Sequence, residues 1–247
     1  MGKIIGISGR KQAGKNTVAN IMHGICLKNQ DLVQDWAVGS NGELIILTSN
    51  DKGVTAWGEF DVSRKDSSFI EYAELQMWPF IKLYSFADSL KKICTDLFEI
   101  PYECVWGTNK QKDKKQSHLK WANMPGCEKK RGCMTSREFM QFFGTEIMRK
   151  IHEPIWINSC IKKIQQEQSE ISVIADVRFP NEVKAIQEAG GIVIRLDRDM
   201  FHSDHPSEVA LDENVFNWSK FDEVISNKKM SIDELCHNIK TNRKIWS

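Results

Sequence analysis

The sequence predicts an α/β fold in which helices cover both faces of a mainly parallel sheet. Short apolar runs, which are typical of buried parallel strands, alternate with segments whose apolar residues have helical spacing. A glycine-rich turn joins the first such strand, residues 3–8, to the first helix, which follows Lys15. The chain has 247 residues, of which 41% are hydrophobic, so one domain with insertions can bury a core without disulfides.

The other expected elements continue this alternation. Expected strands cover residues 80–85, 171–175 and 192–196. Expected helices cover residues 88–98, 135–150, 156–164 and 181–189, and a last helix begins after Ser231. One apolar face of the helix at 88–98 should carry Leu90, Ile93, Leu97 and Phe98. The pattern Ser/Thr-x-x-Glu at Thr135 and at Ser231 predicts a capping box at two of the helix starts.

Two segments interrupt the alternation. Residues 36–80 are predicted to form a β-rich insertion, because strand-like runs at 43–48 and 54–57 flank a polar turn at 49–53. Residues 104–133 are polar and basic and have little periodicity, which predicts a long excursion that is either a mobile lid or a surface loop.

Composition limits the classes of partner. The formal charge is +1, so no global imbalance points to nucleic acid or to a membrane, and no apolar run approaches membrane-spanning length. The stretch from Lys110 to Arg131 is locally basic, and Trp106 and Trp121 could serve there as stacking platforms for single-stranded nucleic acid. The seven cysteines form no C-x-x-C pair, which predicts free thiols in a soluble, cytoplasmic protein.

The glycine-rich turn has the phosphate-binding pattern G-x-x-x-x-G-K from Gly9 to Lys15. Its backbone amides should surround a β-phosphate, and Lys15 should reach the β and γ oxygens, as in the P-loop NTPase three-layer fold. The alternative is a solvated turn that only caps the helix. The hydroxyl expected directly after the lysine arrives one position late, because Asn16 precedes Thr17. Adenylate kinase and related enzymes are similar in this respect, which implies a weak Mg²⁺ contact at Thr17.

Two further groups of polar residues carry chemistry. Asp176 follows a predicted strand, at the edge where open α/β sheets bind ligands, and Arg178 can bring a bidentate guanidinium to a phosphate. Arg137 lies in the first turn of a helix, where the dipole disfavours a cation, so an anionic partner is predicted. Gly144 within the same helix predicts close approach by a ligand or by a neighbouring backbone.

The order of several fragments resembles the deoxynucleoside monophosphate kinases of large tailed bacteriophages. These fragments are the phosphate loop, "SFADSLKK", "SREFMQFFGTE", "IADVRFPNEV", "IRLDRD" and "DHPSE". The resemblance implies that ATP is held by Gly9, Lys11, Ala13, Gly14, Lys15, Asn16, Thr17 and Arg198. It implies acceptor contacts from Lys91, Arg137, Gly144, Thr145, Trp156, Asp176, Arg178 and Glu182. For Trp156, core packing and stacking on a base are equal alternatives.

These observations predict a kinase that uses ATP and Mg²⁺ to convert a dNMP acceptor to a dNDP for DNA precursor synthesis. Lys15, Arg137, Arg178 and Asp176 are the predicted catalytic residues, and the segment 104–133 is expected to close as a lid over phosphates. Dephospho-coenzyme A kinase, phosphomevalonate kinase and a slow NTPase that binds single-stranded nucleic acid are the alternatives. No membrane partner and no nucleic acid are expected, and the oligomeric state is left open between a monomer and a homodimer.

Overall fold

The computed structural model describes residues 2–49, 52–199 and 206–246. Contacts divide the chain into two compact units. The sheet unit comprises Met1–Ser85 and Ile161–Ser247, and the inserted unit comprises Phe86–Cys160. Each unit has its own hydrophobic core.

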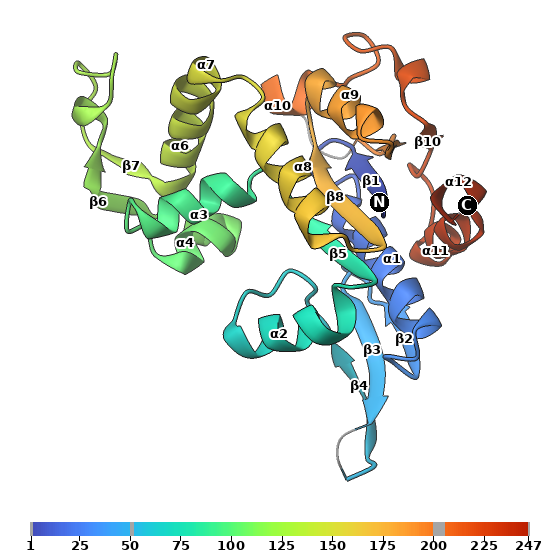
Figure 1. Ribbon diagram of the computed structural model, residues 1–247. Coiled ribbons are helices and arrows are strands. Elements are labelled where there is room, and N and C mark those ends of the chain that lie inside the picture. Colours follow the sequence, from blue (N-terminus) through green and yellow to red (C-terminus); the bar gives the residue numbers. More distant parts are fainter. Residues whose placement is uncertain (1, 50–51, 200–205, 247) are drawn as a thin grey trace. The chain divides into compact units, whose positions relative to one another are not determined.

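The sheet unit is built on five strands in the order β10-β9-β1-β8-β5, and every neighbouring pair is parallel (Figure 1). The strands are β1 (Lys3–Ser8), β5 (Ile81–Tyr84), β8 (Ile171–Val177), β9 (Ile192–Leu196) and β10 (Glu223–Ile225). The four longer strands were predicted. The edge strand β10 was missed, because three residues are too few to show a period.

Helices cover both faces of this sheet, as the fold class requires. Helix α1 (Lys15–Asn29) shares a core with Ile5 and Ile7 on one face. Because side chains alternate along a strand, Gly6 faces the other side, where Ile186 of α9 (Pro180–Glu188) packs against it. Helix α11 (Ile232–Thr241) packs beside α1, and α12 (Arg243–Trp246) follows it. The three layers are those of a P-loop NTPase-like fold.

The insertion between α1 and β5 is only partly a sheet. Strands β2 (Asp35–Val38), β3 (Leu44–Ser49) and β4 (Thr55–Glu59) form an antiparallel sheet, of which β3 and β4 were predicted and β2 was not. The polar turn predicted at 49–53 includes residues 50 and 51, which lie outside the described part. The second half of the segment contradicts the β-rich prediction, because it forms α2 (Ser67–Tyr72) and a π-helical turn, η1 (Ala73–Met77). The buried side chains of Phe69, Ala73 and Met77 join the core of the sheet unit, so helical spacing suits them better than strand alternation.

The inserted unit contains more regular structure than its sequence predicts. Helices α3 (Asp88–Asp96), α4 (Tyr102–Trp106) and α5 (Asn109–Lys112) precede the antiparallel pair β6 (Lys115–Lys120) and β7 (Cys133–Thr135), with η2 (Trp121–Asn123) between the two strands. A helix then runs through α6 (Ser136–Gln141), the π-helical η3 (Phe142–Met148) and α7 (Arg149–Ile151). Helix α8 (Ile155–Glu167) begins in this unit.

Both predicted capping boxes are present, at Thr135 and at Ser231. The prediction that Leu97 belongs to the apolar face of its helix was wrong. Leu97 is 74% exposed, because α3 ends at Asp96 and the chain turns away.

Candidate active site

The carboxyl ends of the parallel strands bring the predicted site residues of the sheet unit to one edge. Ser8, the last residue of β1, lies opposite Val177 of β8 and Arg195 of β9 in the two ladders. The phosphate loop that follows Ser8 therefore begins beside the segment that carries Asp176 and Arg178. This is the edge at which open α/β sheets bind their ligands.

The loop has the backbone that a phosphate cradle requires. Gln12 and Gly14 have φ values of 64° and 96°, and the alternation of left-handed and right-handed residues turns successive N–H groups to one side. A Cβ on Gly9 would lie 3.0 Å from the Cβ of Ala13, so a side chain there would crowd the loop. Asn227, which is buried, donates from Nδ2 to the Ala13 carbonyl at 2.8 Å and holds the loop closed.

The amino terminus of α1 is suited to an anion. No side chain caps its first turn, and that turn contains no acidic residue. The first amides of a helix need an acceptor from elsewhere, and the helix dipole favours a negative one. These features fit the phosphates of a nucleotide and argue against a turn that only caps the helix.

Lys15 is held by the loop itself. Its Nζ donates to the carbonyl oxygens of Gly9 at 2.7 Å and Arg10 at 2.8 Å. The pKa of Lys15 is lowered to about 8, chiefly by burial and then by the neighbouring charge of Arg178, whereas Glu208 and Asp176 oppose the shift. Lys15, Arg178 and Asp176 therefore lie close enough for their charges to act on one another, and their catalytic roles stay predictions.

Glu208 connects the phosphate loop to Arg178, and no role for this residue was predicted from the sequence. It lies in α10 (Pro206–Val209), where one carboxylate oxygen accepts from the Lys11 amide at 2.8 Å and the other pairs with the Arg178 guanidinium. Burial opposes ionisation of Glu208, but the charge of Arg178 and these hydrogen bonds hold its pKa below the usual value. A carboxylate thus occupies two donors that a phosphate would use. Its presence in the fragment "DHPSE" was the available signal.

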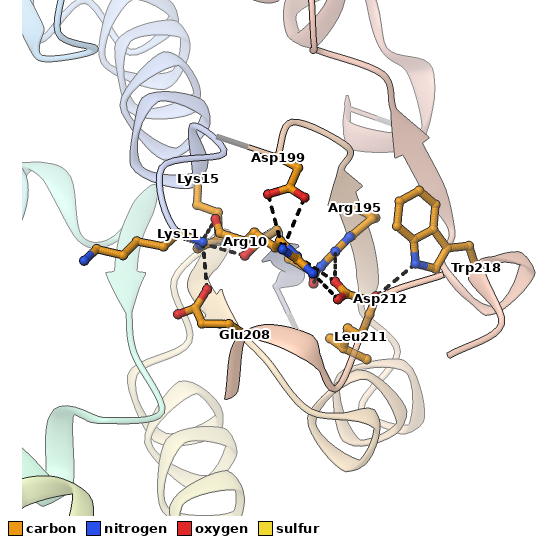
Figure 2. A network of polar contacts seen from close by, with 11 residues as sticks. Arg10, Lys11, Lys15, Arg195, Asp199, Glu208, Leu211, Asp212 and Trp218 are labelled. Atoms are coloured by element: carbon orange, nitrogen blue, oxygen red, sulfur yellow. Dashed lines mark hydrogen bonds and ion pairs between the residues drawn. The ribbon is translucent and has the colours of Figure 1, made fainter. Parts of the chain in front are cut away.

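A second set of ion pairs fixes Arg10 (Figure 2). Its guanidinium donates to both oxygens of Asp212, with Nε at 3.0 Å, and its Nη1 lies 3.2 Å from Asp199. The same Asp212 lies 3.5 Å from buried Arg195, whose guanidinium also stands 5.1 Å from the centre of the Trp218 ring. The network ties the phosphate loop to two segments near residues 199 and 212.

Asp176 and Glu182 make different contacts. The Asp176 carboxylate accepts from the Ser85 hydroxyl at 2.5 Å, so the ends of β5 and β8 are joined there. Glu182 is 2% exposed, and it accepts from the backbone amides of Arg178 at 2.7 Å and Phe179 at 3.1 Å. Glu182 therefore shapes the turn that carries Arg178, and its predicted contact with the acceptor stays a prediction.

A cavity of about 290 Å³ lies beside the phosphate loop. Its wall includes Gln12, Gly14, Thr17 and Arg198, together with Asn227 and the start of α11. Arg198 thus lines the same cavity as Gly14 and Thr17 of the phosphate loop. Its predicted contact with the donor nucleotide stays a prediction.

The remaining predicted acceptor residues belong to the inserted unit. Arg137 donates from Nε to Asp113 at 2.7 Å and from Nη2 to Asn109 at 2.9 Å. The Lys91 ammonium stands 4.5 Å from the centre of the Trp106 ring, which is a cation–π distance. Both contacts lie within the inserted unit.

Gly144 and Trp156 are joined, and Thr145 next to Gly144 is exposed. A Cβ on Gly144 would lie 2.7 Å from the Leu90 side chain, so a neighbouring side chain, and not the predicted neighbouring backbone, approaches this glycine. Trp156 is 5% exposed and donates from Nε1 to the Gly144 carbonyl at 3.1 Å. Its core-packing alternative is the one this geometry favours.

Three further properties concern metal ligands, membrane helices and cysteines among the described residues. No group of three or more His, Cys, Asp and Glu side chains among them could hold a metal ion. No helix among them is long and apolar enough to cross a membrane. All seven cysteines are free thiols, and five of them are buried.

Comparison with known proteins decides the family. The sequence model of the deoxynucleotide monophosphate kinase family matches residues 60–239. The chain belongs to this family. The match begins after the phosphate loop and covers β5, β8 and β9 with the intervening inserted unit.

Two viral relatives agree with the family. A protein of Acanthamoeba polyphaga mimivirus, provisionally named a deoxynucleotide monophosphate kinase, is 35% identical in an alignment of 144 positions that covers 51% of this chain and 67% of that protein. The deoxynucleoside-5'-monophosphate kinase of Escherichia phage T5 is 26% identical in an alignment of 256 positions that covers 96% of each chain. The protein is therefore a phosphotransferase that acts on nucleoside monophosphates. The other small-molecule kinases and the nucleic-acid module are not favoured.

Proposed function

We propose that the protein transfers the γ-phosphoryl group of ATP to a deoxynucleoside monophosphate and releases ADP and the deoxynucleoside diphosphate. The observation that carries this proposal is the anion site at the start of α1, where Lys15 and Arg178 stand together. An oxygen of the acceptor phosphate forms the new bond to the γ-phosphorus, and the bond from that phosphorus to the β-bridging oxygen breaks. The acceptor is already ionised, so the step needs no strong base.

The predicted catalytic residues of the sheet unit would each act on a different part of the reacting groups. Lys15 would balance the β and γ oxygens, and Arg178 would neutralise charge that develops during transfer. Asp176 would orient the acceptor or a water molecule beside it. Mg²⁺, when bound, would neutralise phosphate charge, and Thr17 is the loop residue whose hydroxyl would help to hold it.

Acceptor recognition is proposed for Lys91, Arg137, Gly144, Thr145, Asp176, Arg178 and Glu182. Trp156 would act there through its hydrogen bond to Gly144. The viral relatives suggest that the reaction supplies DNA precursors in the cytoplasm of an infected cell.

The test is an ADP-release assay with ATP and Mg²⁺, run across all deoxynucleoside and ribonucleoside monophosphates. We expect turnover with at least one deoxynucleoside monophosphate and weaker turnover with its ribonucleotide. Equal background rates with every monophosphate would contradict the proposal. Dephospho-coenzyme A and phosphomevalonate serve as controls and should not be phosphorylated.

A further inference from the structure

The cavity beside the phosphate loop has one wall that comes from the insertion. Ser40, Asn41 and Gly42, in the turn between β2 and β3, line it together with Thr17 and Arg198. This turn and the phosphate loop are both parts of the sheet unit. The family match begins at residue 60, so the turn lies outside the part of the chain that it covers.

The turn is fixed against α1. The carbonyl of Gly42 accepts from Asn20 Nδ2 at 2.8 Å, and the Gly42 backbone has a φ of 86°. A side chain on Gly42 would collide with the Thr17 hydroxyl, so the turn approaches the loop as closely as glycine permits. At the other end of β2, the Trp36 indole occupies the space left by Gly24 of α1.

Hydrogen bonds within the turn keep its tip in place. The amide of Gly39 donates to the Glu43 carbonyl, and the amide of Gly42 donates to the Gly39 carbonyl, both at 2.9 Å. The backbone N–H of Asn41 donates to the Glu43 carboxylate at 2.9 Å. The side chains of Ser40 and Asn41 remain exposed at the cavity. The turn therefore presents two polar side chains from a prearranged backbone.

The lining suits one nucleobase. Met230, Ile232 and Leu235 provide apolar surface, which the faces of a purine need, and Ser40, Asn41 and Asn227 provide polar groups for its edge. Asn227 Oδ1 and Arg198 Nε are buried and make no hydrogen bond among the described residues. The volume, about 290 Å³, is at the small end for ligand pockets, so it fits a base better than a whole nucleotide.

We propose that the turn Gly39–Gly42 is a wall of the donor-base pocket, and that Asn41, assisted by Ser40, recognises the base of the nucleoside triphosphate. An asparagine amide can donate and accept at once, as the edge of adenine requires. This inference rests on the proposed function, because it takes the donor triphosphate to lie on the phosphate loop.

The test separates base recognition from phosphate binding. Calorimetry would measure the Kd of ATP and of inorganic tripolyphosphate for the wild type, Asn41→Ala and the double variant Ser40→Ala/Asn41→Ala. One lost hydrogen bond corresponds to a weakening of about fivefold, so we expect that factor for ATP with Asn41→Ala and about tenfold or more with the double variant. Tripolyphosphate should bind all three proteins equally, and the KM of the deoxynucleoside monophosphate should not change.

A matched control comes from the same insertion. Thr55 begins β4 and lies opposite Ser49, the last residue of β3, and the two hydroxyls are hydrogen-bonded at 2.9 Å. Thr55→Ala should leave the Kd of ATP unchanged, and the same Tm for all variants would show that they fold alike.

Two results would overturn the inference: unchanged ATP binding in the double variant, or an equal loss for ATP and tripolyphosphate. The proposed function fails separately, if the wild type itself neither binds ATP nor transfers phosphate. If the wild type transfers phosphate and the turn variants bind ATP with the wild-type Kd, only the role of the turn is rejected.

Discussion

The two units hold their cations in different ways. At the sheet edge, Arg10 and Arg178 pair with Asp212 and Glu208, whose side chains are only 15% and 11% exposed. In the inserted unit, Arg137 is 36% exposed and its partner, Asp113, is 55% exposed. An exposed ion pair contributes roughly 0–1 kcal/mol, whereas sheltered pairs fix their geometry more firmly. The phosphate loop is thus prearranged, while Arg137 can exchange its partner for a substrate at little cost.

The two hydrophobic cores also differ in how far apart their residues lie in the sequence. The core of the sheet unit draws on α1, the parallel strands, the insertion and α11, which lie far apart in the sequence. The core of the inserted unit consists of Cys94, Ile100, Cys104, Val105, Leu119, Met134 and Phe139, all from one continuous stretch. The phosphate loop is therefore supported by a core whose residues are far apart in the sequence, whereas Arg137 is supported by a core built from neighbouring segments.

The largest effect should come from removing Lys15. Lys15→Met keeps an apolar stem of similar length but lacks the charge that balances the transferred phosphate. We expect kcat to fall by about 10³-fold or more, because lost electrostatic stabilisation of this kind has that size. The ADP-release assay measures it, with the Tm showing that the variant is folded. A folded variant with retained turnover would contradict the role given to the loop.

Acid should weaken the sheet unit through His23. This residue is fully buried in α1, and burial lowers the pKa of its imidazole to about 4. Because the folded-state pKa is below the unfolded one near 6.5, stability is present above pH 6.5 and is lost as the pH falls toward 4, by about 3 kcal/mol. Urea unfolding at several pH values should show this slope, and His23→Gln should reduce it.

The histidines of the inserted unit provide the contrast for that measurement. His118 and His152 are exposed, and Asn substitutions at these two positions supply the matched variants for comparison with His23→Gln. An equal slope in His23→Gln and the wild type would show that another group causes the acid sensitivity.

Arg137 tests the role of the exposed ion pair in the inserted unit. Arg137→Ala should raise the KM of the deoxynucleoside monophosphate about tenfold, since one charge-assisted contact to a phosphate has that worth. The KM of ATP should stay the same. Asp113→Asn is the control, because it removes the exposed partner and leaves the guanidinium in place. A change confined to the KM of ATP would place Arg137 with the donor instead.

The smallest effect is expected at Glu208. Its carboxylate competes with phosphate for the Lys11 amide and for Arg178, so Glu208→Gln should tighten tripolyphosphate binding by about threefold to tenfold. Calorimetry measures this directly. Glu213→Gln, which alters an exposed carboxylate outside these contacts, is the matched control. Weaker binding in Glu208→Gln would show that the carboxylate supports the site more than it occupies it.

Local sequence signals determined much of this protein. Apolar runs predicted four of the five parallel strands. Two capping boxes predicted where α6 and α11 begin, and the spacing from Gly9 to Lys15 predicted the phosphate loop. Each signal lies within a few residues, because backbone hydrogen bonds and side-chain alternation act over that distance.

Tertiary structure alone decided the rest. The contact of Glu208 with Lys11 spans 197 residues, and that of Arg10 with Asp212 spans 202. No local pattern specifies either contact, and the same is true of the turn Gly39–Gly42 against Thr17 or of Leu90 beside Gly144. Such pairs form only when the completed sheet aligns the ends of its strands, so the phosphate loop and the strand end at Asp176 could be predicted from the sequence but these long-range contacts could not.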